Sequence, residues 1–230
     1  MTLLAADMGG TKSSLWLFER ENGRRETRDA ARLRSSDYPN ARSVPAAFLK
    51  GRRVQAAAVA IAAPVRDGRA ETPNLPWEVE HAALTRVLGT NRVELINDLA
   101  ATAYGIVDLG PEALATLNEG RPGTGAIAII AAGTGLGDAA AAHALDIFVR
   151  LYGAEAGNLA LKFLATGGVY VAGGIAPRIL ARLRSGPFME GFLAKGRHSG
   201  LLQAIAVKVV LEPKTALFGA ARRAEALAAA

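Results

Sequence analysis

A glycine-rich turn between two apolar stretches near the N-terminus constrains this chain more than any other feature. Residues 3–6 and 13–18 are mostly apolar, which predicts a strand, a turn and a second strand. The turn carries Gly9, Gly10 and Thr11, and paired glycines can adopt positive φ and let a ligand approach the backbone. Their free amides, with the Thr11 hydroxyl, would form a concave donor surface for phosphate oxygens. Asp7, at the end of the first strand, is placed to hold a magnesium ion through water. An ordinary hairpin turn would explain Gly-Gly-Thr alone, but the preceding carboxylate favours a phosphate site.

Composition excludes several classes of protein. The chain has 230 residues and 50% of them are hydrophobic, which is enough for a sizeable core and one or two domains. The absence of cysteine excludes disulfides, thiolate metal sites and a cysteine nucleophile. The three histidines lie far apart, without metal-binding spacing. No signal peptide and no apolar run long enough to span a bilayer is present, so we expect a cytoplasmic protein without a membrane partner.

The net charge of +6 raises the question of nucleic-acid binding. Basic residues gather at 24–34 and 50–53, but acidic residues are interspersed among them and no aromatic residues interleave to stack on bases. We interpret these stretches as a solvated arginine-rich surface, with no nucleic-acid partner.

The remainder of the chain alternates apolar, strand-like runs with amphipathic stretches. After the first hairpin we expect a charged irregular segment and a short helix near residues 44–52. Further strands are predicted at 54–62, 92–96, 126–131, 168–172 and 206–211, and helices at 81–88, 99–106, 145–164 and 215–227. This pattern predicts an α/β fold with a ligand at the carboxyl ends of the strands. We expect an N-terminal α/β domain over residues 1–110 and a C-terminal one over 111–230.

The candidate catalytic residue is Asp98, which follows Asn97 where a predicted strand gives way to a helix. An aspartate at that position is, taken alone, more often a helix N-cap. Two separate glycine-rich turns favour instead a general base that deprotonates a substrate hydroxyl during phosphoryl transfer. The second turn comprises Gly133, Thr134, Gly135 and Gly137 around Leu136.

Two other nucleotide-binding patterns fit poorly. A P-loop requires G-x-x-x-x-G-K-[ST], and no glycine stands at its first position before Lys12 and Ser13. The second turn reads G-T-G-L-G rather than G-x-G-x-x-G, and Glu155, about 20 residues on, lies in a helical pattern. A dinucleotide-binding dehydrogenase is therefore a weak alternative.

Five motifs in order resemble the bacterial glucokinase family, the sugar kinases of the two-domain actin-like ATPase (hexokinase/ribonuclease H-like) fold. These motifs are residues 6–12, 74–77, 96–101, 133–137 and 169–175, and the resemblance runs through nearly the whole chain. It implies ATP and Mg²⁺ as cofactors, a hexose as substrate and a possible homodimer. Ala6, Asp7, Met8, Gly9, Gly10 and Thr11 would form the first phosphate turn, and Gly173 and Gly174 would border the adenosine. Asp98 would act on the sugar 6-hydroxyl, while Asn97 and Asn74 would hold other hydroxyls.

One departure from the family pattern concerns the sugar site. After the second turn the family continues with further strands and a Glu-x-Gly-His-type segment that binds sugar. Here Gly137 is followed by an alanine-rich run and the terminal helical region, so the second domain looks truncated near residues 139–142. The loss would also leave an unpaired edge in that domain's sheet. Two hypotheses follow: an ATP-dependent hexose kinase, acting on glucose, or a catalytically impaired relative that keeps the fold and nucleotide binding.

Overall fold

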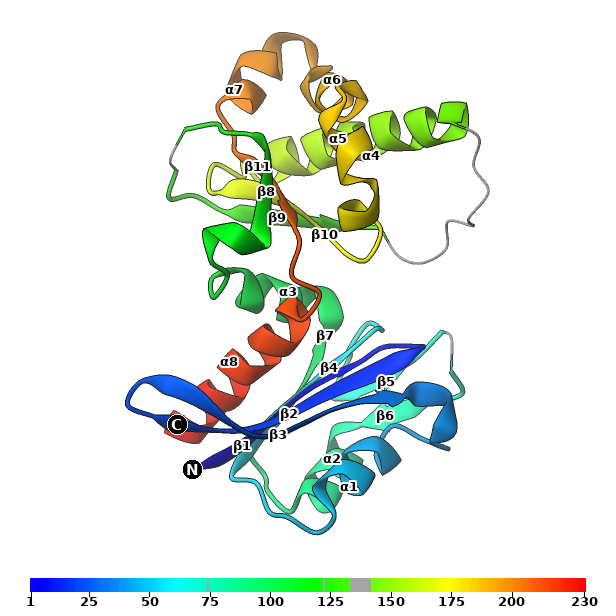
Figure 1. Cartoon of the computed structure of the whole chain (residues 1–230), viewed down its shortest axis with the longest axis vertical. Helices are drawn as coiled ribbons and strands as arrows, with labels where there is room; N and C mark the ends of the chain where they lie inside the picture. The colour runs from blue at the N-terminus through cyan, green and yellow to red at the C-terminus, as the bar shows by residue number, and fades with distance from the viewer. Residues whose placement is uncertain (74, 122, 133–141) are drawn as a thin grey trace. The chain divides into compact units, whose positions relative to one another are not determined.

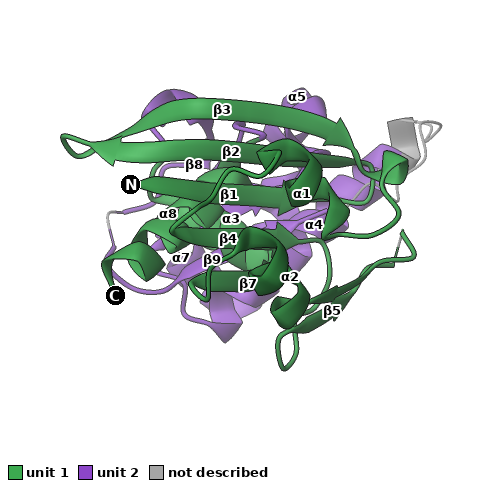
Figure 2. Cartoon of the chain, turned by 90° about the horizontal axis from the view of Figure 1, so that it is seen from below, with its two compact units in different colours: residues 1–108, 214–230 green, residues 109–213 purple. Residues whose placement is uncertain are grey.

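The computed structural model describes residues 1–73, 75–121, 123–132 and 142–230, and these form two compact units (Figures 1 and 2). Unit 1 comprises Met1–Asp108 together with Lys214–Ala230, and unit 2 comprises Leu109–Pro213. The chain is thus divided differently from the predicted 1–110 and 111–230. Residues 214–230 belong with the first unit because the apolar face of their helix packs on its sheet.

Unit 1 is built on a five-stranded mixed sheet with the strand order β3-β2-β1-β4-β7. The first three strands in the chain form an antiparallel meander, whereas β1, β4 and β7 run parallel. The strands are β1 (Thr2–Met8), β2 (Lys12–Glu21), β3 (Arg24–Arg34), β4 (Ala56–Ile61) and β7 (Val93–Asn97). A separate two-stranded ribbon pairs β5 (Arg69–Glu71) with β6 (Glu78–Glu80).

Strand β3 corrects the prediction of an irregular segment after the first hairpin. Residues 24–34 pair with β2 over its whole length, although their side chains are exposed or half-buried throughout. A charged sequence forms a strand here because β3 lies at the sheet edge, where charged side chains reach solvent and disfavour pairing with other chains.

Helices cover both faces of this sheet. On one face, α1 (Ser43–Leu49) and α2 (His81–Leu88) pack on Leu4, Ala6 and Met8 of β1. On the other face, α3 (Asp98–Ile106) and α8 (Thr215–Ala229) pack on Leu3 and Ala5. This division follows from the two-residue alternation of side chains along a strand.

Helices α3 and α8 cross at two glycines. A Cβ atom on Gly105 would lie 1.9 Å from the Thr215 carbonyl oxygen, and one on Gly219 would lie 1.7 Å from that of Ala101. The close backbone approach therefore requires glycine at both positions, and it fixes α3 against α8.

Unit 2 contains a four-stranded sheet with the order β8-β11-β10-β9. Its strands are β8 (Leu114–Asn118), β9 (Ile127–Ala131), β10 (Gly168–Ala172) and β11 (Val207–Val210). Its helices are α4 (Ala142–Lys162), α5 (Leu180–Arg184), α6 (Pro187–Leu193) and α7 (Ser199–Gln203). Short 3₁₀ turns lie at Ser35–Asp37 in unit 1 and, in unit 2, at Pro111–Ala113, Ala176–Ile179 and Gly196–His198. None of the described helices is long and apolar enough to cross a bilayer.

Strand β9 forms an edge of this sheet among the described residues, pairing with β10 alone. The apolar strand predicted at 126–131 is therefore only partly covered: Ile127 is 45% exposed, and Ile129, Ile130 and Ala131 are half-buried. The open edge agrees with the expectation that a segment of the family pattern is missing directly after this strand.

Candidate active site

The ends of three parallel strands define the candidate site within unit 1. Met8 of β1 pairs with Ile61 of β4, and Ile61 pairs with Asn97 of β7. Neighbouring strands lie about 4.8 Å apart, so the first glycine turn and the start of α3 leave the sheet about 10 Å from one another. The register therefore brings Asp7 and Asp98 to the same sheet end, as the sequence predicted.

Asp7 is a partly buried carboxylate on the face of the sheet that α3 covers. Burial and, to a smaller extent, the negative charge of Asp98 together raise the pKa of Asp7 to about 6, against a lowering effect of Arg32. Arg32 lies in the same cross-strand row as Asp7, because Asp7 pairs with Ser14 and Ser14 pairs with Arg32. The site thus holds two carboxylates whose mutual repulsion a cation would relieve.

Asp98 is the first residue of α3, but it is not the cap of that helix. Asn97 is the N-cap, and its Oδ1 accepts hydrogen bonds from the amides of Leu99 and Ala100. Asp98 Oδ1 accepts hydrogen bonds from Asn97 Nδ2 at 3.0 Å and from the Leu99 amide at 2.9 Å. Burial raises the pKa of Asp98, and these hydrogen bonds oppose the rise. Because its neighbour supplies the cap, the ordinary structural explanation for Asp98 does not apply.

Asn97 is fully engaged within the protein. Besides the two amides that it caps, it donates through Nδ2 to the Ala63 carbonyl at 3.1 Å and to Asp98. Two donated and two accepted bonds exhaust the hydrogen-bonding capacity of an amide side chain. Asn97 thus holds Asp98 through a hydrogen bond, while its expected contact with a substrate hydroxyl stays a prediction.

The first glycine turn is tight, although not for the predicted reason. Neither Gly9 nor Gly10 is among the glycines with positive φ. Glycine is favoured at position 9 because its amide donates to the Lys12 carbonyl at 3.0 Å, and an added Cβ would lie 3.1 Å from that oxygen, which would have to shift slightly. Within the described residues no acceptor takes the amides of Gly10 and Thr11, and Thr11 is exposed. These donors remain available to an anion.

Two buried serines hold this turn, and sequence reasoning missed both. Ser35 donates its hydroxyl to the Gly9 carbonyl at 2.7 Å, and its amide donates to the Thr11 carbonyl at 3.1 Å. The hydroxyls of Ser13 and Ser35 lie 3.0 Å apart, and both residues are fully buried. The one sequence signal for Ser13 is its position in β2, where it alternates with apolar residues on the buried face of the strand. Ser35 lies 26 residues from Gly9, so no local pattern could have revealed it.

In unit 2 the third glycine motif follows β10. Gly173 has φ +89°, and a Cβ there would lie 2.8 Å from the Ala132 carbonyl oxygen, whereas Gly174 has open space around it. Tyr152 of α4 ties the ends of β9 and β10 together, since its hydroxyl accepts from the Ala132 amide at 3.1 Å and lies 3.4 Å from the Ala172 carbonyl. Burial raises the pKa of Tyr152 to about 12. Sequence reasoning placed Tyr152 on a helix face without giving it this contact.

Five predicted site residues lie outside the described residues. They are Asn74 of the expected sugar loop and Gly133, Thr134, Gly135 and Gly137 of the second glycine turn. Their expected roles stay predictions.

The described residues contain no cluster of three or more His, Asp or Glu side chains that could form an all-protein metal site. A magnesium ion held through water by one carboxylate, with phosphate oxygens as further ligands, needs no such cluster. The raised pKa of Asp7 beside Asp98 marks the place where a cation would be favoured, so the residues present fit this ion.

Solved structures identify the fold. A glucokinase from an Antarctic psychrotroph has a TM-score of 0.83 at 20% sequence identity, covering 98% of this chain and 99% of that one. A ROK family glucokinase from Streptomyces griseus, in complex with glucose and AMPPNP, has a TM-score of 0.65 at 18% identity, with coverage of 98% and 100%. The chain therefore has the actin-like ATPase fold of these sugar kinases.

Sequence comparison supplies the family. The glucokinase family model matches residues 4–143 and 138–227. The glucokinase of Synechocystis sp. is 31% identical over 346 positions, covering 96% of this chain and 97% of the relative, and that of Caulobacter vibrioides is 28% identical with 95% and 93% covered. The chain belongs to the glucokinase family.

The same comparisons locate a missing segment. The alignment with the Synechocystis protein spans 346 positions against the 230 residues of this chain, which leaves at least 116 positions without a counterpart. The two matches to the family model meet at residues 138–143, where the sequence predicted a junction. This chain therefore lacks an internal part of the family pattern between β9 and α4.

Proposed function

We propose that this protein is an ATP-dependent hexose kinase that converts D-glucose to glucose 6-phosphate, with Asp98 as general base. The observation that carries the proposal is the placement of Asp98 at the carboxyl end of the unit 1 sheet, beside Asp7 and the first glycine turn, in a chain of the glucokinase family. The ligands named for the Streptomyces griseus structure, glucose and AMPPNP, support both substrates.

Asp98 is suited to accept the proton of a sugar hydroxyl. Both hydrogen bonds from Asn97 and Leu99 go to Oδ1, which orients the carboxylate and leaves Oδ2 to accept the proton of the substrate hydroxyl. Burial raises the pKa of Asp98, which makes its carboxylate a stronger base than that of an exposed aspartate. Asn97 acts through Asp98 as a positioning residue.

The first glycine turn would hold the phosphates. The amides of Gly10 and Thr11 donate toward the anion, and Ser35 keeps the turn in place through the Gly9 carbonyl. Asp7 would hold Mg²⁺ through water, and this ion supplies charge neutralisation on the transferring phosphoryl group. Gly133, Thr134, Gly135 and Gly137 would form the opposing phosphate turn, Gly173 and Gly174 would border the adenosine, and Asn74 would contact the sugar.

A coupled ADP-release assay over a panel of hexoses tests this function. We expect glucose-dependent ADP production that falls about 10²–10⁴-fold in Asp98→Ala, the usual contribution of a general base. Asp37→Ala, which removes an exposed aspartate outside the site, should keep the wild-type rate. Glucose-dependent ADP production no greater than that of Asp98→Ala would refute the proposal.

The missing segment favours a second candidate, a nucleotide-binding protein that does not phosphorylate sugar. At least 116 positions of the Synechocystis relative have no counterpart here, and each sugar hydroxyl left without its partner costs about 1–3 kcal/mol. This candidate predicts saturable binding of a fluorescent ATP analogue without turnover of any hexose. Robust turnover would exclude it.

A further inference from the structure

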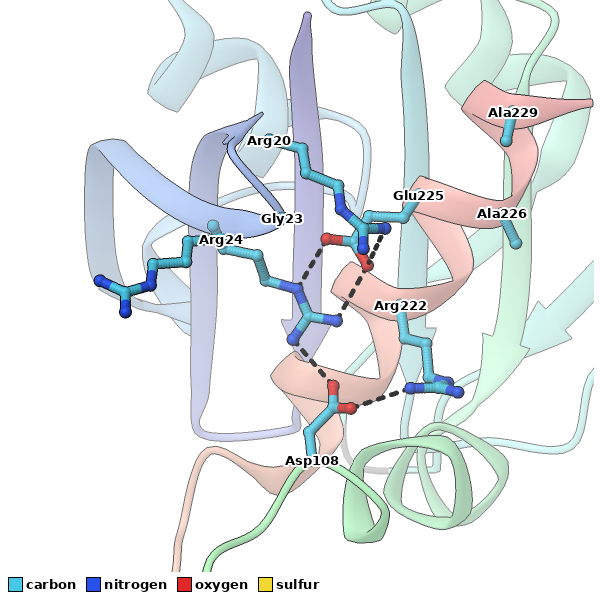
Figure 3. Close-up of a pocket in the computed structure, with 9 residues that line it drawn as sticks. Arg20, Gly23, Arg24, Asp108, Arg222, Glu225, Ala226 and Ala229 are labelled. Atoms are coloured by element: carbon cyan, nitrogen blue, oxygen red, sulfur yellow. Dashed lines mark hydrogen bonds and ion pairs between the residues drawn. The ribbon is translucent and has the colours of Figure 1, made fainter.

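A polar pocket lies in unit 1 (Figure 3). It is at the opposite end of the sheet from Asp7, because Arg20 pairs with Arg25 near the β2–β3 turn whereas Asp7 pairs with Ser14. It has a volume of about 640 Å³ and lies between the β2–β3 hairpin, the C-terminal part of α8 and the residue just beyond α3. The seven residues of β1 separate it from the candidate active site by about 20 Å. Its lining residues are Arg20, Gly23, Arg24, Arg25, Asp108, Arg222, Glu225, Ala226 and Ala229.

Arg25 forms ion pairs with both carboxylates of the pocket. Its Nε and Nη2 donate to the two oxygens of Glu225 at 2.8 and 3.0 Å, and its Nη1 donates to Asp108 at 2.8 Å. Every nitrogen of this guanidinium is thus engaged. Arg25 therefore joins the hairpin to Glu225 of α8 and to Asp108.

Three further arginines carry positive charge that these carboxylates do not saturate. Arg222 makes one contact, from Nη1 to Asp108 at 2.9 Å, and its side chain is 51% exposed. Arg20 lies 3.9 Å from Glu225 and is 57% exposed. Arg24 forms no ion pair with the described residues, and its guanidinium points away from the carboxylates. The lining holds four arginines against two carboxylates, a net charge of +2.

We propose that this pocket binds a small molecule that carries a phosphate group. Its volume lies in the range of ligand sites, and Gly23, Ala226 and Ala229 contribute only small side chains or none to its lining. Arginine guanidinium groups match phosphate oxygens in pairs of parallel N–H bonds, and weakly hydrated Arg is favoured over Lys at such sites. Asp108 and Glu225 hold Arg25 in place, and Arg20 and Arg222 supply the donors, which the exposed Arg24 joins when its guanidinium turns toward the pocket. The proposal stands independently of the kinase function.

NMR titration of the ¹⁵N-labelled full chain at low ionic strength tests it, because each site reports through its own amides. Inorganic pyrophosphate and ribose 5-phosphate are the two probes, and the stronger of them distinguishes an inorganic from an organic phosphate ligand. We expect saturable shifts at Gly23, Ala226 and Ala229 with at least one probe. Shifts confined to residues 9–12, or shifts near the pocket that do not saturate, would overturn the proposal.

Three variants locate the binding. Arg222→Ala and Arg24→Ala should each weaken the affinity about tenfold, the loss expected for one charge-assisted hydrogen bond. Arg24 is exposed, so its variant folds even where Arg222→Ala loses stability. Arg69→Ala removes the same charge from an exposed β5 position outside the pocket and should leave the affinity unchanged. Equal affinity in all three variants would contradict the assignment.

Discussion

The two ends of the unit 1 sheet treat their carboxylates in opposite ways. At the end where β2 and β3 meet, Asp108 and Glu225 accept hydrogen bonds from arginines, with three bonds from Arg25 alone. At the other end, Asp7 and Asp98 lie near one another, and Arg32 lowers the pKa of Asp7 by less than burial or Asp98 raises it. The first pair holds the hairpin to α8, whereas neither carboxylate of the second pair has an ion-pair partner among the described residues.

This difference separates structure from function. A buried carboxylate with a raised pKa lowers stability at neutral pH, and such groups persist mainly where chemistry needs them. Helix α3 joins the two ends, since Asp98 begins it and Asp108 lies just beyond its end. The predictions below test whether the two ends behave as this comparison requires.

The largest effect is expected where α3 and α8 cross. Gly219→Ala places a Cβ atom 1.7 Å from the Ala101 carbonyl oxygen, so the helices must separate, at a cost of about 3 kcal/mol or more. Gly200→Ala, at a helical position with nothing within 4 Å, should be neutral or slightly stabilising. Urea denaturation measures both. A cost below about 1 kcal/mol for Gly219→Ala would show that the crossing does not join the two ends.

The next largest loss of stability is expected on replacing Arg25, which pairs with both Asp108 and Glu225. Arg25 is only 19% exposed, and burial alone would lower the pKa of its guanidinium, but the hydrogen bonds to Glu225 and Asp108 raise it above its ordinary value. Arg25→Ala should cost about 2–3 kcal/mol, because it removes three charge-assisted hydrogen bonds and leaves Asp108 paired only with Arg222 and Glu225 only with the more distant Arg20. Arg69→Ala, which breaks an exposed pair with Glu80, should cost less than about 1 kcal/mol in the same assay. Equal losses of stability in Arg25→Ala and Arg69→Ala would show that the ion pairs of Arg25 have no special structural role.

Replacing Asp7 should change stability in the opposite direction and make the protein more stable. Its folded-state pKa of about 6 lies above the ordinary value of 3.8, so the folded state binds more protons and stability falls as the pH rises through this window. Asp7→Asn should therefore stabilise the protein by about 1–3 kcal/mol at pH 8 and by almost nothing below pH 4. Urea denaturation at both pH values checks this, and a destabilised variant at pH 8 would contradict it.

The smallest effect concerns the serine that holds the first glycine turn. Ser35→Ala removes the hydroxyl between the Gly9 carbonyl and Ser13 and should cost about 1 kcal/mol. It should also weaken binding of an ATP analogue. Ser36→Ala, at the adjacent exposed position, is the matched control. Two variants that cannot be told apart would mean that the turn needs no such support.

Local patterns predicted much of this architecture. The helix at 81–88 and the strand at 168–172 have the predicted bounds, because apolar periodicity and flanking glycines act over a few residues. The position of Asp98 at a strand end was predictable for the same reason.

The features that local sequence patterns did not predict depend on contacts between residues that lie far apart in the chain. The charged β3 segment forms a strand because β2 offers it an edge to pair with. Helix α8 belongs to unit 1 although residues 109–213 of unit 2 precede it in the chain. Likewise, Asn97 rather than Asp98 caps α3, and Ser35 supports a turn 26 residues away. Each of these contacts is fixed by tertiary packing rather than by local propensity.

The most direct test of the comparison is the pKa of Asp7, measured by carboxyl ¹³C NMR titration in the wild type and in Asp98→Asn. If Asp7 and Asp98 are two buried carboxylates that repel one another, the pKa of Asp7 should be about 6 in the wild type. It should be lower in the variant, in which the neighbouring charge is gone. A wild-type pKa near the ordinary 3.8, unchanged by Asp98→Asn, would contradict the claim that this end of the sheet is held ready for function.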